Sequence, residues 1–407
     1  MNQNKLKIFN DPIYGFINIP SELIFDVIEH PYFQRLRRIT QMGLSNLVYP
    51  GANHTRFHHA LGAMHLMQKA VEILRFKGIH ISEQEDEALY LAILLHDVGH
   101  GPFSHTLENA ILKEVHHEEV SLMIMRELNA EFNNQLDLAI KIFTNQYDRP
   151  FLYQLISSQI DMDRMDYLKR DSFYSGVAEG NVNSNRLIHM LNVYEDELVI
   201  EEKGIYSIEK FLIARRLMYW QAYLHKTSLV AEIMLENVLK RARTLVLNQK
   251  KLDCSANLHY FLSQEIKQTH FNHERLKKFT TLDDIDIMSA LKNWQYADDF
   301  ILSTLSKAII NRKLFKIKIS KDKFDESFLE DLKKEVMKKY AIDEEALTYF
   351  CFDGKVKHLT YDKEFAPIKI LRKDKTIVRF EKISEQMKYK AYSKPTVKYF
   401  YAFIDSL

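Results

Sequence analysis

The string from Leu94 to His105, LLHDVGHGPFSH, constrains this chain more than any other feature of its sequence. It follows an apolar segment typical of a buried helix and ends at a Gly-Pro break. Neighbouring residues project about 100° apart on a helix, so the side chains of His96 and Asp97 can both reach one metal from its end. Imidazole plus carboxylate suits a first-row divalent ion such as Fe, Mn, Zn, Ni or Co. The string therefore predicts a transition-metal site where a buried helix ends.

Further ligand candidates flank this string. Upstream lies Arg56–Gly62, RFHHALG, at the start of a predicted long helix; downstream lies Asp161–Tyr167, DMDRMDY, with Asp171 after it. A lone histidine is usually a core or capped residue, and paired aspartates on a helix are usually solvated. The order His, then His-Asp, then Asp, each beside a long helix, favours a metal over these alternatives. It predicts a site of two histidines and two carboxylates.

Most of the chain has the pattern of long helices. Eleven glycines in 407 residues leave few tight turns. Apolar residues at positions 60, 64, 67, 71 and 74 mark one helix face, and Gly78 follows as a stop signal. Ser82 and Glu85 form a capping-box pattern that predicts the start of the next helix. Residues 208 to about 248 predict one or two further long helices.

The pattern changes near the C-terminus. Runs of β-branched and aromatic residues, separated by turn residues, predict strands at 314–319, 347–352, 368–371, 376–380 and 397–404. We therefore expect a mainly α protein with a helical body, residues 1–305, and a smaller α+β C-terminal region, residues 306–407.

Charge and cysteine content limit the environment and partners of the chain. The formal net charge is +1, but Lys307–Lys398 contains 24 Lys and Arg against 15 Asp and Glu. This excess would suit nucleic acid or a polyanionic substrate of a neighbouring subunit, although a solvated surface is the simpler interpretation. Two cysteines predict no disulfide framework. With no signal-like N-terminus and no apolar stretch of about 18 residues, we expect a cytoplasmic protein without a membrane span.

The motifs HDxGHGPFSH and IDxDRxDYxxRD, with the helix start RFxH before them, resemble the HD-domain superfamily. Within it they resemble the deoxynucleoside triphosphate triphosphohydrolases, the dGTPase-like enzymes, especially the branch of the SAM-and-HD-domain deoxynucleotidase. The strings KIFNDPI (7–13), FQRLR (33–37), YPGA (49–52) and AYLHK (222–226) extend the resemblance over roughly residues 5–245. It implies an HD helical bundle with core motifs in 54–171 and no SAM domain before it.

The resemblance implies a reaction and a metal site. The family cleaves between the α-phosphorus and the nucleoside oxygen, which releases deoxynucleoside and intact triphosphate. The metal ligands would be His59, His96, Asp97 and Asp163, with His59 preferred over His58 because the family's ligand is the fourth residue of its Arg-Phe-x-His string. His105 matches the catalytic histidine that assists at the leaving 5′-oxygen, and Glu108, where the family has Asp, would orient it.

Substrate contacts follow from the same resemblance. Phosphate-binding roles fall on His100, His117, Arg56, Arg164 and Arg215; Mg²⁺ would accompany the triphosphate. Gln41, Tyr167 and Asp171 match positions that hold the deoxyribose and its 3′-hydroxyl, and Tyr223 matches an aromatic that leaves no room for a 2′-hydroxyl. Without the metal motif, the arginines would be interpreted as structural ion pairs and Tyr223 as a core residue.

The branch also suggests regulation. Lys7, Glu29, Gln34 and Arg37 match positions that bind an activating guanine nucleotide, and Asn10 and Arg186 would support a second nucleotide. A homo-oligomer, dimer or tetramer, is expected by analogy. However, Glu201-Glu202 stands where the family has a basic stretch that grips activator phosphates, so we hypothesise that activation is altered or absent.

Three alternatives remain open at this stage. One is another HD phosphohydrolase that acts on a nucleoside monophosphate, GTP, (p)ppGpp or a cyclic nucleotide, although the string HDVGHGP differs from the HD-GYP signature of cyclic-dinucleotide enzymes. Another is a nucleic-acid-binding HD protein or exonuclease, for which the basic C-terminal region is the direct support. The third is a ligand-sensing HD protein without turnover, which the retention of every ligand candidate argues against.

Overall fold

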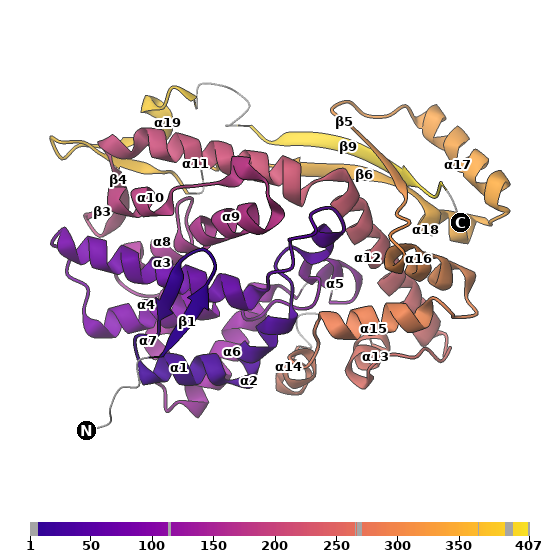
Figure 1. Cartoon of the computed structure of the whole chain (residues 1–407), viewed down its shortest axis with the longest axis horizontal. Helices are drawn as coiled ribbons and strands as arrows, with labels where there is room; N and C mark the ends of the chain where they lie inside the picture. Colours follow the sequence, from indigo (N-terminus) through magenta and orange to yellow (C-terminus); the bar gives the residue numbers. More distant parts are fainter. Residues whose placement is uncertain are drawn as a thin grey trace.

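The computed structural model describes residues 7–112, 115–264, 266, 271–364, 366–386 and 394–405, without the side chains of residues 104, 105 and 109. Within this part the chain is mainly helical, with small sheets at the N-terminus and in the C-terminal region (Figure 1). This confirms the predicted mainly α fold class with a smaller α+β end.

The N-terminal half holds a hairpin followed by the helices that carry the predicted motifs. Its elements are β1 (Ile8–Asp11), β2 (Gly15–Asn18), α1 (Glu22–Glu29), α2 (Pro31–Gln34), η1 (Arg35–Arg38), η2 (Gly43–Leu47), α3 (Arg56–Phe76), α4 (Glu83–Leu95), α5 (Ser104–Ala110), α6 (His117–Glu131), α7 (Asp137–Phe143), α8 (Pro150–Ile156), α9 (Met162–Ser175), η3 (Ala178–Gly180) and α10 (Ser184–Met190).

The second half begins with a short hairpin and two long helices. Its elements are β3 (Leu191–Tyr194), β4 (Glu197–Glu201), η4 (Glu202–Gly204), α11 (Ile205–Met218), the π-helical turn η5 (Tyr219–Tyr223), α12 (Lys226–Leu247), α13 (Ala256–Leu262), α14 (His273–Phe279), α15 (Asp284–Trp294), α16 (Phe300–Ile310), β5 (Lys316–Ser320), α17 (Glu326–Tyr340), α18 (Glu344–Phe350), β6 (Cys351–His358), β7 (Lys369–Leu371), β8 (Ile377–Arg379), α19 (Phe380–Ile383) and β9 (Thr396–Phe403).

The helix α3 is the centre of the body, and its buried face is the one that the sequence predicts. The residues at 60, 64, 67, 71 and 74 are all buried, and α3 packs against both α4 and α9. The left-handed Gly78 follows the helix, with φ +86°, a conformation that glycine adopts without steric cost. Burial of this face stabilises the fold by about 1.5–3 kcal/mol for each large apolar side chain. This packing brings together the helix ends that carry the predicted histidine and aspartate motifs.

The start of α4 also agrees with the sequence. The Ser82 hydroxyl accepts a hydrogen bond from the Glu85 backbone N–H at 3.2 Å, and the Glu85 carboxylate accepts one from the Ser82 N–H at 2.8 Å. These are the two reciprocal bonds of a capping box. The helix that follows is buried along most of its length and ends at Leu95, directly before the His-Asp pair.

The C-terminal region joins the body through a shared sheet. Strand β7 pairs in parallel with β4 of the β3–β4 hairpin, with Ile200 opposite Ile370, and β8 extends the sheet to the order β3-β4-β7-β8. A second sheet has the order β5-β9-β6, both pairs antiparallel, and lies above α11 and α12 in Figure 1. The division at residue 305 stays a prediction.

One predicted strand is wrong. Residues 347–352 do not form a strand of their own, because α18 runs to Phe350 and β6 begins only at Cys351. The cause is that the apolar run also fits a short helix, which begins before the run. The Asp343 carboxylate accepts a hydrogen bond from the Ala346 N–H at 2.8 Å, and Ala346 and Phe350, four residues apart, are both buried. The other four predicted strands correspond to β5, β7, β8 and β9 within one or two residues.

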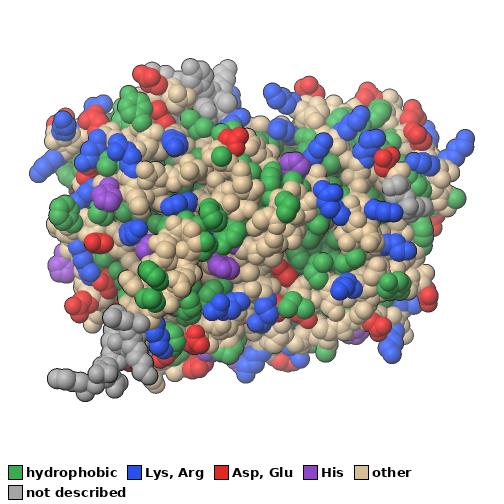
Figure 2. Space-filling view, viewed as in Figure 1, with side chains coloured by type: hydrophobic (Ala, Val, Ile, Leu, Met, Phe, Trp, Pro, Cys, Tyr) green, Lys and Arg blue, Asp and Glu red, His purple; other side chains and the backbone are tan. Residues whose placement is uncertain are grey.

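The surface and helix lengths bear on two further expectations. Basic and acidic side chains are interspersed on the face drawn in Figure 2, including the part of the C-terminal region at the upper right. This is the pattern of a solvated charged surface. In the part of the chain that the structure describes, no helix combines the length and apolar character needed to cross a bilayer.

We expect Ser82→Ala to lower the free energy of unfolding by about 1 kcal/mol, because it removes the hydroxyl that accepts the hydrogen bond from the Glu85 backbone N–H. The measurement is a urea unfolding curve followed by circular dichroism. The matched control is Ser289→Ala, an exposed serine within α15, which should change stability by less than about 0.5 kcal/mol. Identical midpoints for Ser82→Ala and the unmodified chain would contradict this role.

Candidate active site

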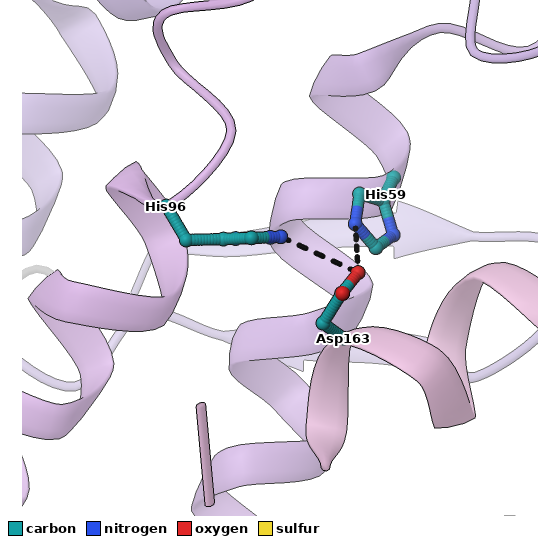
Figure 3. A group of neighbouring side chains, drawn as sticks. All are labelled: His59, His96 and Asp163. Carbon is teal, nitrogen blue, oxygen red and sulfur yellow. Dashed lines mark ion pairs between the residues drawn. The ribbon is translucent and has the colours of Figure 1, made fainter. Parts of the chain in front are cut away.

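Three of the four predicted metal ligands converge in the body. His59 lies on the first turn of α3, His96 directly follows α4, and Asp163 lies in the first turn of α9. The Oδ1 atom of Asp163 is 3.2 Å from His59 Nε2 and 3.4 Å from His96 Nε2. Figure 3 shows both imidazoles directed at this carboxylate. The three motifs are 37 or more residues apart in sequence, so the packing of α3 against α4 and α9 creates the site.

Hydrogen bonds at the two Nδ1 atoms fix the tautomer of each imidazole ring. His59 Nδ1 lies 2.8 Å from Asp166 Oδ2, and His96 Nδ1 lies 2.7 Å from the carbonyl oxygen of Ile93. Both partners accept, so each Nδ1 carries the proton in the neutral ring and Nε2 keeps a lone pair. The two Nε2 atoms are buried and make no hydrogen bond. Histidines that bind a metal are almost always held in this way.

A buried ion-pair chain supports His59. Arg170 donates to both oxygens of Asp166, at 2.9 and 3.1 Å, and to Asp11 Oδ2 at 2.7 Å. Burial opposes ionisation of Asp166, but Arg170 and His59 lower its pKa to about 2. Gly62 makes the close approach of α3 and α9 feasible, because a Cβ at that position would collide with the Asp166–Arg170 pair. The local sequence therefore sets the ring orientation.

Asp97, the fourth predicted ligand, faces the same centre but is shared with other partners. Its Oδ1 lies 3.4 Å from His96 Nε2 and 3.3 Å from His100 Nε2, and its Oδ2 lies 3.9 Å from His59 Nε2. The same Oδ2 accepts from Arg56 at 2.7 Å. Asp97 also groups with His100 and His117, whose rings stack with centroids 3.8 Å apart. Glu108 Oε1 lies 3.4 Å from His117 Nδ1.

The donor set fits a divalent transition metal. Burial opposes protonation of His59, yet Asp163 and Asp166 raise its pKa to about 10, so a metal bound here would displace the proton from Nε2. Burial likewise opposes ionisation of Asp163 and Asp97, but the neighbouring histidines hold both carboxyl pKa values below their usual range. Burial and Arg56 lower the pKa of His100 to about 3. Ionised carboxylates facing two imidazole nitrogens match the ligands of the metals predicted from the sequence.

Two predicted phosphate-binding arginines border this centre. The side chain of Arg164 pairs with Asp161, the N-cap residue of α9, and Arg215 on α11 donates to Gln159 Oε1 at 3.0 Å. In each guanidinium the Nε atom is buried without a hydrogen-bond partner. Gln159 and Arg164 also line a cavity of about 510 Å³. Unsatisfied buried donors of this kind suit an anionic ligand.

A second group surrounds Asp171, one of the residues predicted to hold the deoxyribose. Asp171 Oδ1 lies 2.7 Å from His54 Nε2, and Tyr223 donates to its Oδ2 at 2.7 Å. The rings of Tyr167 and Tyr223 meet edge to face at 6.3 Å. Gln41 donates its backbone N–H to the His54 carbonyl, and its side-chain Oε1 is buried without a partner. The predicted sugar residues therefore lie in one neighbourhood.

Several residues of the site escaped the sequence analysis. Asp161, Asp166 and Arg170 fall within the motif IDxDRxDYxxRD, so the motif carried a signal, but it did not indicate their separate roles. His54, two residues before the RFxH string, had no signal of its own. Nothing in the sequence indicated that Tyr219 would begin a π-helical turn. The side chain of His105 lies outside the described residues.

Four of the six predicted activator residues, Lys7, Glu29, Gln34 and Arg37, lie on α1 or beside it. The Lys7 ammonium lies 2.8 Å from the centroid of the Phe25 ring, and Gln34 donates to the Ile28 carbonyl at 2.8 Å. Arg37 donates to Gln34 at 2.9 Å and covers the Phe57 ring. Glu29 and Asn10 are exposed, and Arg186 donates to Ser207 at 3.0 Å.

The acidic pair that departs from the family pattern has basic neighbours. Glu201 binds the ammonium groups of Lys77 and Lys203, each at 2.7 Å, and Glu202 lies 3.6 Å from Arg372. The repulsion expected from two free acids is therefore reduced at Glu201. The effect on activation stays a prediction.

Comparisons with known proteins agree with this geometry. A family model described as HD domain matches residues 56–171, and one described as HD associated region matches residues 182–261. The uncharacterized protein YwfO of Bacillus subtilis is 35% identical over 320 residues, which cover 76% of this chain and 71% of that protein. A phosphohydrolase structure from Bacteroides thetaiotaomicron has a TM-score of 0.94 at 49% identity and covers 98% of this chain and 100% of its own.

The name of another relative includes a substrate class, which is a property of that relative. The deoxynucleoside triphosphate triphosphohydrolase SAMHD1 homolog of Dictyostelium discoideum is 30% identical over 255 residues. The match covers 58% of this chain and 49% of that protein, so about half of the SAMHD1 homolog has no counterpart in the comparison.

We expect Asp166→Asn to weaken Mn²⁺ binding about 10–100-fold, because loss of the carboxylate that orients His59 is a typical outer-ligand defect. The measurement is isothermal titration calorimetry on metal-stripped protein. Asp331→Asn, on the exposed face of α17, is the matched control.

Removing Asp166 also withdraws a buried partner from Arg170, so circular dichroism must first show that the variant is folded. A folded Asp166→Asn protein that binds Mn²⁺ as tightly as the unmodified chain would contradict the orienting role.

Proposed function

Because this chain belongs to the HD-domain superfamily, in the branch similar to the SAMHD1 triphosphohydrolases, we propose that it hydrolyses deoxynucleoside triphosphates to deoxynucleoside and inorganic triphosphate. That it is an HD-domain phosphohydrolase follows from the family match and the phosphohydrolase neighbour. The observation that carries the dNTP proposal is the adjacency of three groups. A histidine–carboxylate centre, two arginines with unused donors and a Tyr–Asp pair adjoin one another around α9.

His59, His96, Asp97 and Asp163 would hold the metal. When bound, a divalent ion supplies Lewis-acid polarisation of the α-phosphate and lowers the pKa of an attacking water. The chain's own contribution is orientation, since the far nitrogens of both imidazoles are already engaged. His96 and His100 keep Asp97 ionised against its burial, and Arg56 adds to this effect through its hydrogen bond to the same carboxylate.

Arg164 and Arg215 would bind the triphosphate, and Mg²⁺ would accompany it. A guanidinium can grip two phosphate oxygens at once, which suits a polyphosphate chain. Both side chains approach the site already held by one partner each, Asp161 and Gln159. This pre-orientation reduces the entropy lost when the phosphates bind. We assign His100 and His117 to the same phosphates.

The group around Asp171 would select the sugar. His54 and Tyr223 hold the carboxylate from two sides, which fixes it for a hydrogen bond from a 3′-hydroxyl. The hydrogen bond from Tyr223 to Asp171 also holds the tyrosine in place. We assign to Tyr223 the exclusion of a 2′-hydroxyl. Gln41, whose side-chain oxygen is buried without a partner, and Tyr167 complete the sugar site.

We assign proton donation to the leaving 5′-oxygen to His105, whose ordinary pKa near neutrality suits this step. Glu108 belongs to the same helix, α5, and its carboxylate is close to His117. Glu108 would therefore act on one of these two histidines. Assembly into a dimer or tetramer belongs to the same proposal, and activation by a guanine nucleotide at Lys7, Glu29, Gln34 and Arg37 is proposed to be altered or absent.

The reaction is tested by incubating Mn- or Fe-loaded protein with each of the four dNTPs and with GTP, and resolving the products by ion-pair chromatography. We expect deoxynucleoside and intact triphosphate. The His96→Ala/Asp97→Ala variant should lose about 1,000-fold or more in rate, because several kcal/mol of transition-state stabilisation depend on the metal.

His80→Ala/Asp148→Ala, which changes an exposed histidine and an exposed aspartate, is the matched control and should retain activity. If no single nucleotide turns over, GTP or dGTP is added as activator with each of the others. A mixture that is still inert, with the metal bound, would sink the triphosphohydrolase proposal and direct attention to monophosphates and cyclic nucleotides.

A further inference from the structure

One histidine of the C-terminal region reaches the wall of the candidate active site. His358 ends β6, is 6% exposed, and stacks on Tyr219 with ring centroids 3.8 Å apart and an interplanar angle of 21°. Its Nε2 atom is buried and has no hydrogen-bond partner. A buried polar atom without a partner lowers the stability of the fold, so core packing alone does not explain a histidine at this position.

The neighbours of His358 belong to the site described above. Tyr219 opens the π-helical turn that ends at Tyr223, and the two rings lie 5.1 Å apart. Tyr219 also interacts electrostatically with Arg164 and with Tyr167. Isolated π-helical turns of this kind are frequently found at functional sites. The stack therefore connects β6 directly to residues assigned to substrate binding.

The electrostatic surroundings of His358 are cationic. Burial, together with Arg215 and Arg216, lowers its pKa to about 4. The ring is thus neutral near pH 7 and can offer an N–H at Nε2. Arg164 and Arg215 present unused Nε donors in the same neighbourhood. Several unused buried donors around one tyrosine lack an acceptor, and an anion would supply it.

We propose that His358 is a ligand of the substrate's triphosphate chain, which completes from the C-terminal sheet an anion site shared with Arg164 and Arg215. This assignment rests on the proposed function, because it takes the phosphates of that reaction as the anion. It gives the C-terminal region a direct role in substrate binding. It also explains why a histidine, rather than an apolar residue, ends β6 against an aromatic ring.

A purely structural role is separable from phosphate binding. His358→Phe keeps an aromatic ring against Tyr219 and removes the donor, whereas His358→Gln removes the ring and offers an amide N–H instead. Lys398→Met is the matched control, because the Lys398 ammonium lies 3.8 Å from the Trp220 ring centroid in the same contact between the sheet and the turn. It alters that contact without removing a proposed phosphate ligand.

The experiment measures the affinity of the full-length, metal-loaded chain for inorganic tripolyphosphate, and separately for deoxyguanosine, by isothermal titration calorimetry. We expect His358→Phe to bind tripolyphosphate about tenfold or more weakly, as befits one lost hydrogen bond to a charged group. Its deoxyguanosine affinity should be unchanged. His358→Gln should recover part of the loss, and Lys398→Met should bind like the unmodified chain.

The two proposals fail in different ways. If the unmodified chain binds tripolyphosphate and folded His358→Phe binds it equally well, the ligand role of His358 is overturned while the proposed reaction stands. A loss in Lys398→Met as large as that in His358→Phe would also overturn it, because any disturbance of the sheet contact would then suffice. If the unmodified chain has no affinity for tripolyphosphate, the ligand role of His358 is overturned, and the turnover assay decides separately whether the proposed reaction stands.

Discussion

The buried carboxylate of Asp166 is the interaction on which the rest of the site depends. It receives His59 on one side and Arg170 on the other, with all three side chains fully buried. An ionised carboxylate can stay in such a place only if charged partners offset its desolvation, which otherwise costs several kcal/mol. Helices α3 and α9 must therefore remain at their close separation, and Gly62 at their contact is the residue that permits it.

The same constraint extends to the N-terminus. Arg170 continues to Asp11, which also accepts backbone N–H groups from Ile13 and Tyr14 in the turn between β1 and β2. The orientation of a metal-ligating imidazole is thus linked to a hairpin some 50 residues before it in sequence. A disturbance of that hairpin would reach the metal centre through three ion pairs rather than through general loosening of the fold.

The sequence predicts what depends on periodicity and order, and misses what depends on packing between distant segments. The apolar face of α3, the capping box at Ser82 and the order of the histidine and aspartate motifs are local patterns, and the structure agrees with them. The strand expected at 347–352 was wrong because apolar residues there also fit a short helix capped by Asp343. The role of Asp166 could not be predicted, since it depends on α3 and α9 meeting at Gly62. For the same reason, His54 and His358 carried no signal.

The site therefore has two parts built by different means. The metal side comes from regular helices whose ends meet at fixed points, and such elements hold ligands precisely enough for one coordination geometry. The phosphate and sugar side comes partly from α9, which carries Arg164, Tyr167 and Asp171. The rest comes from α11, from the sheet packed over it and from the π-helical turn, where the backbone departs from α-helical regularity. Irregular elements tolerate change in side-chain size and direction more readily than a helix pair locked by a buried ion pair. Differences in substrate among relatives would accordingly be expected around Tyr219 and His358, while the metal side stays fixed.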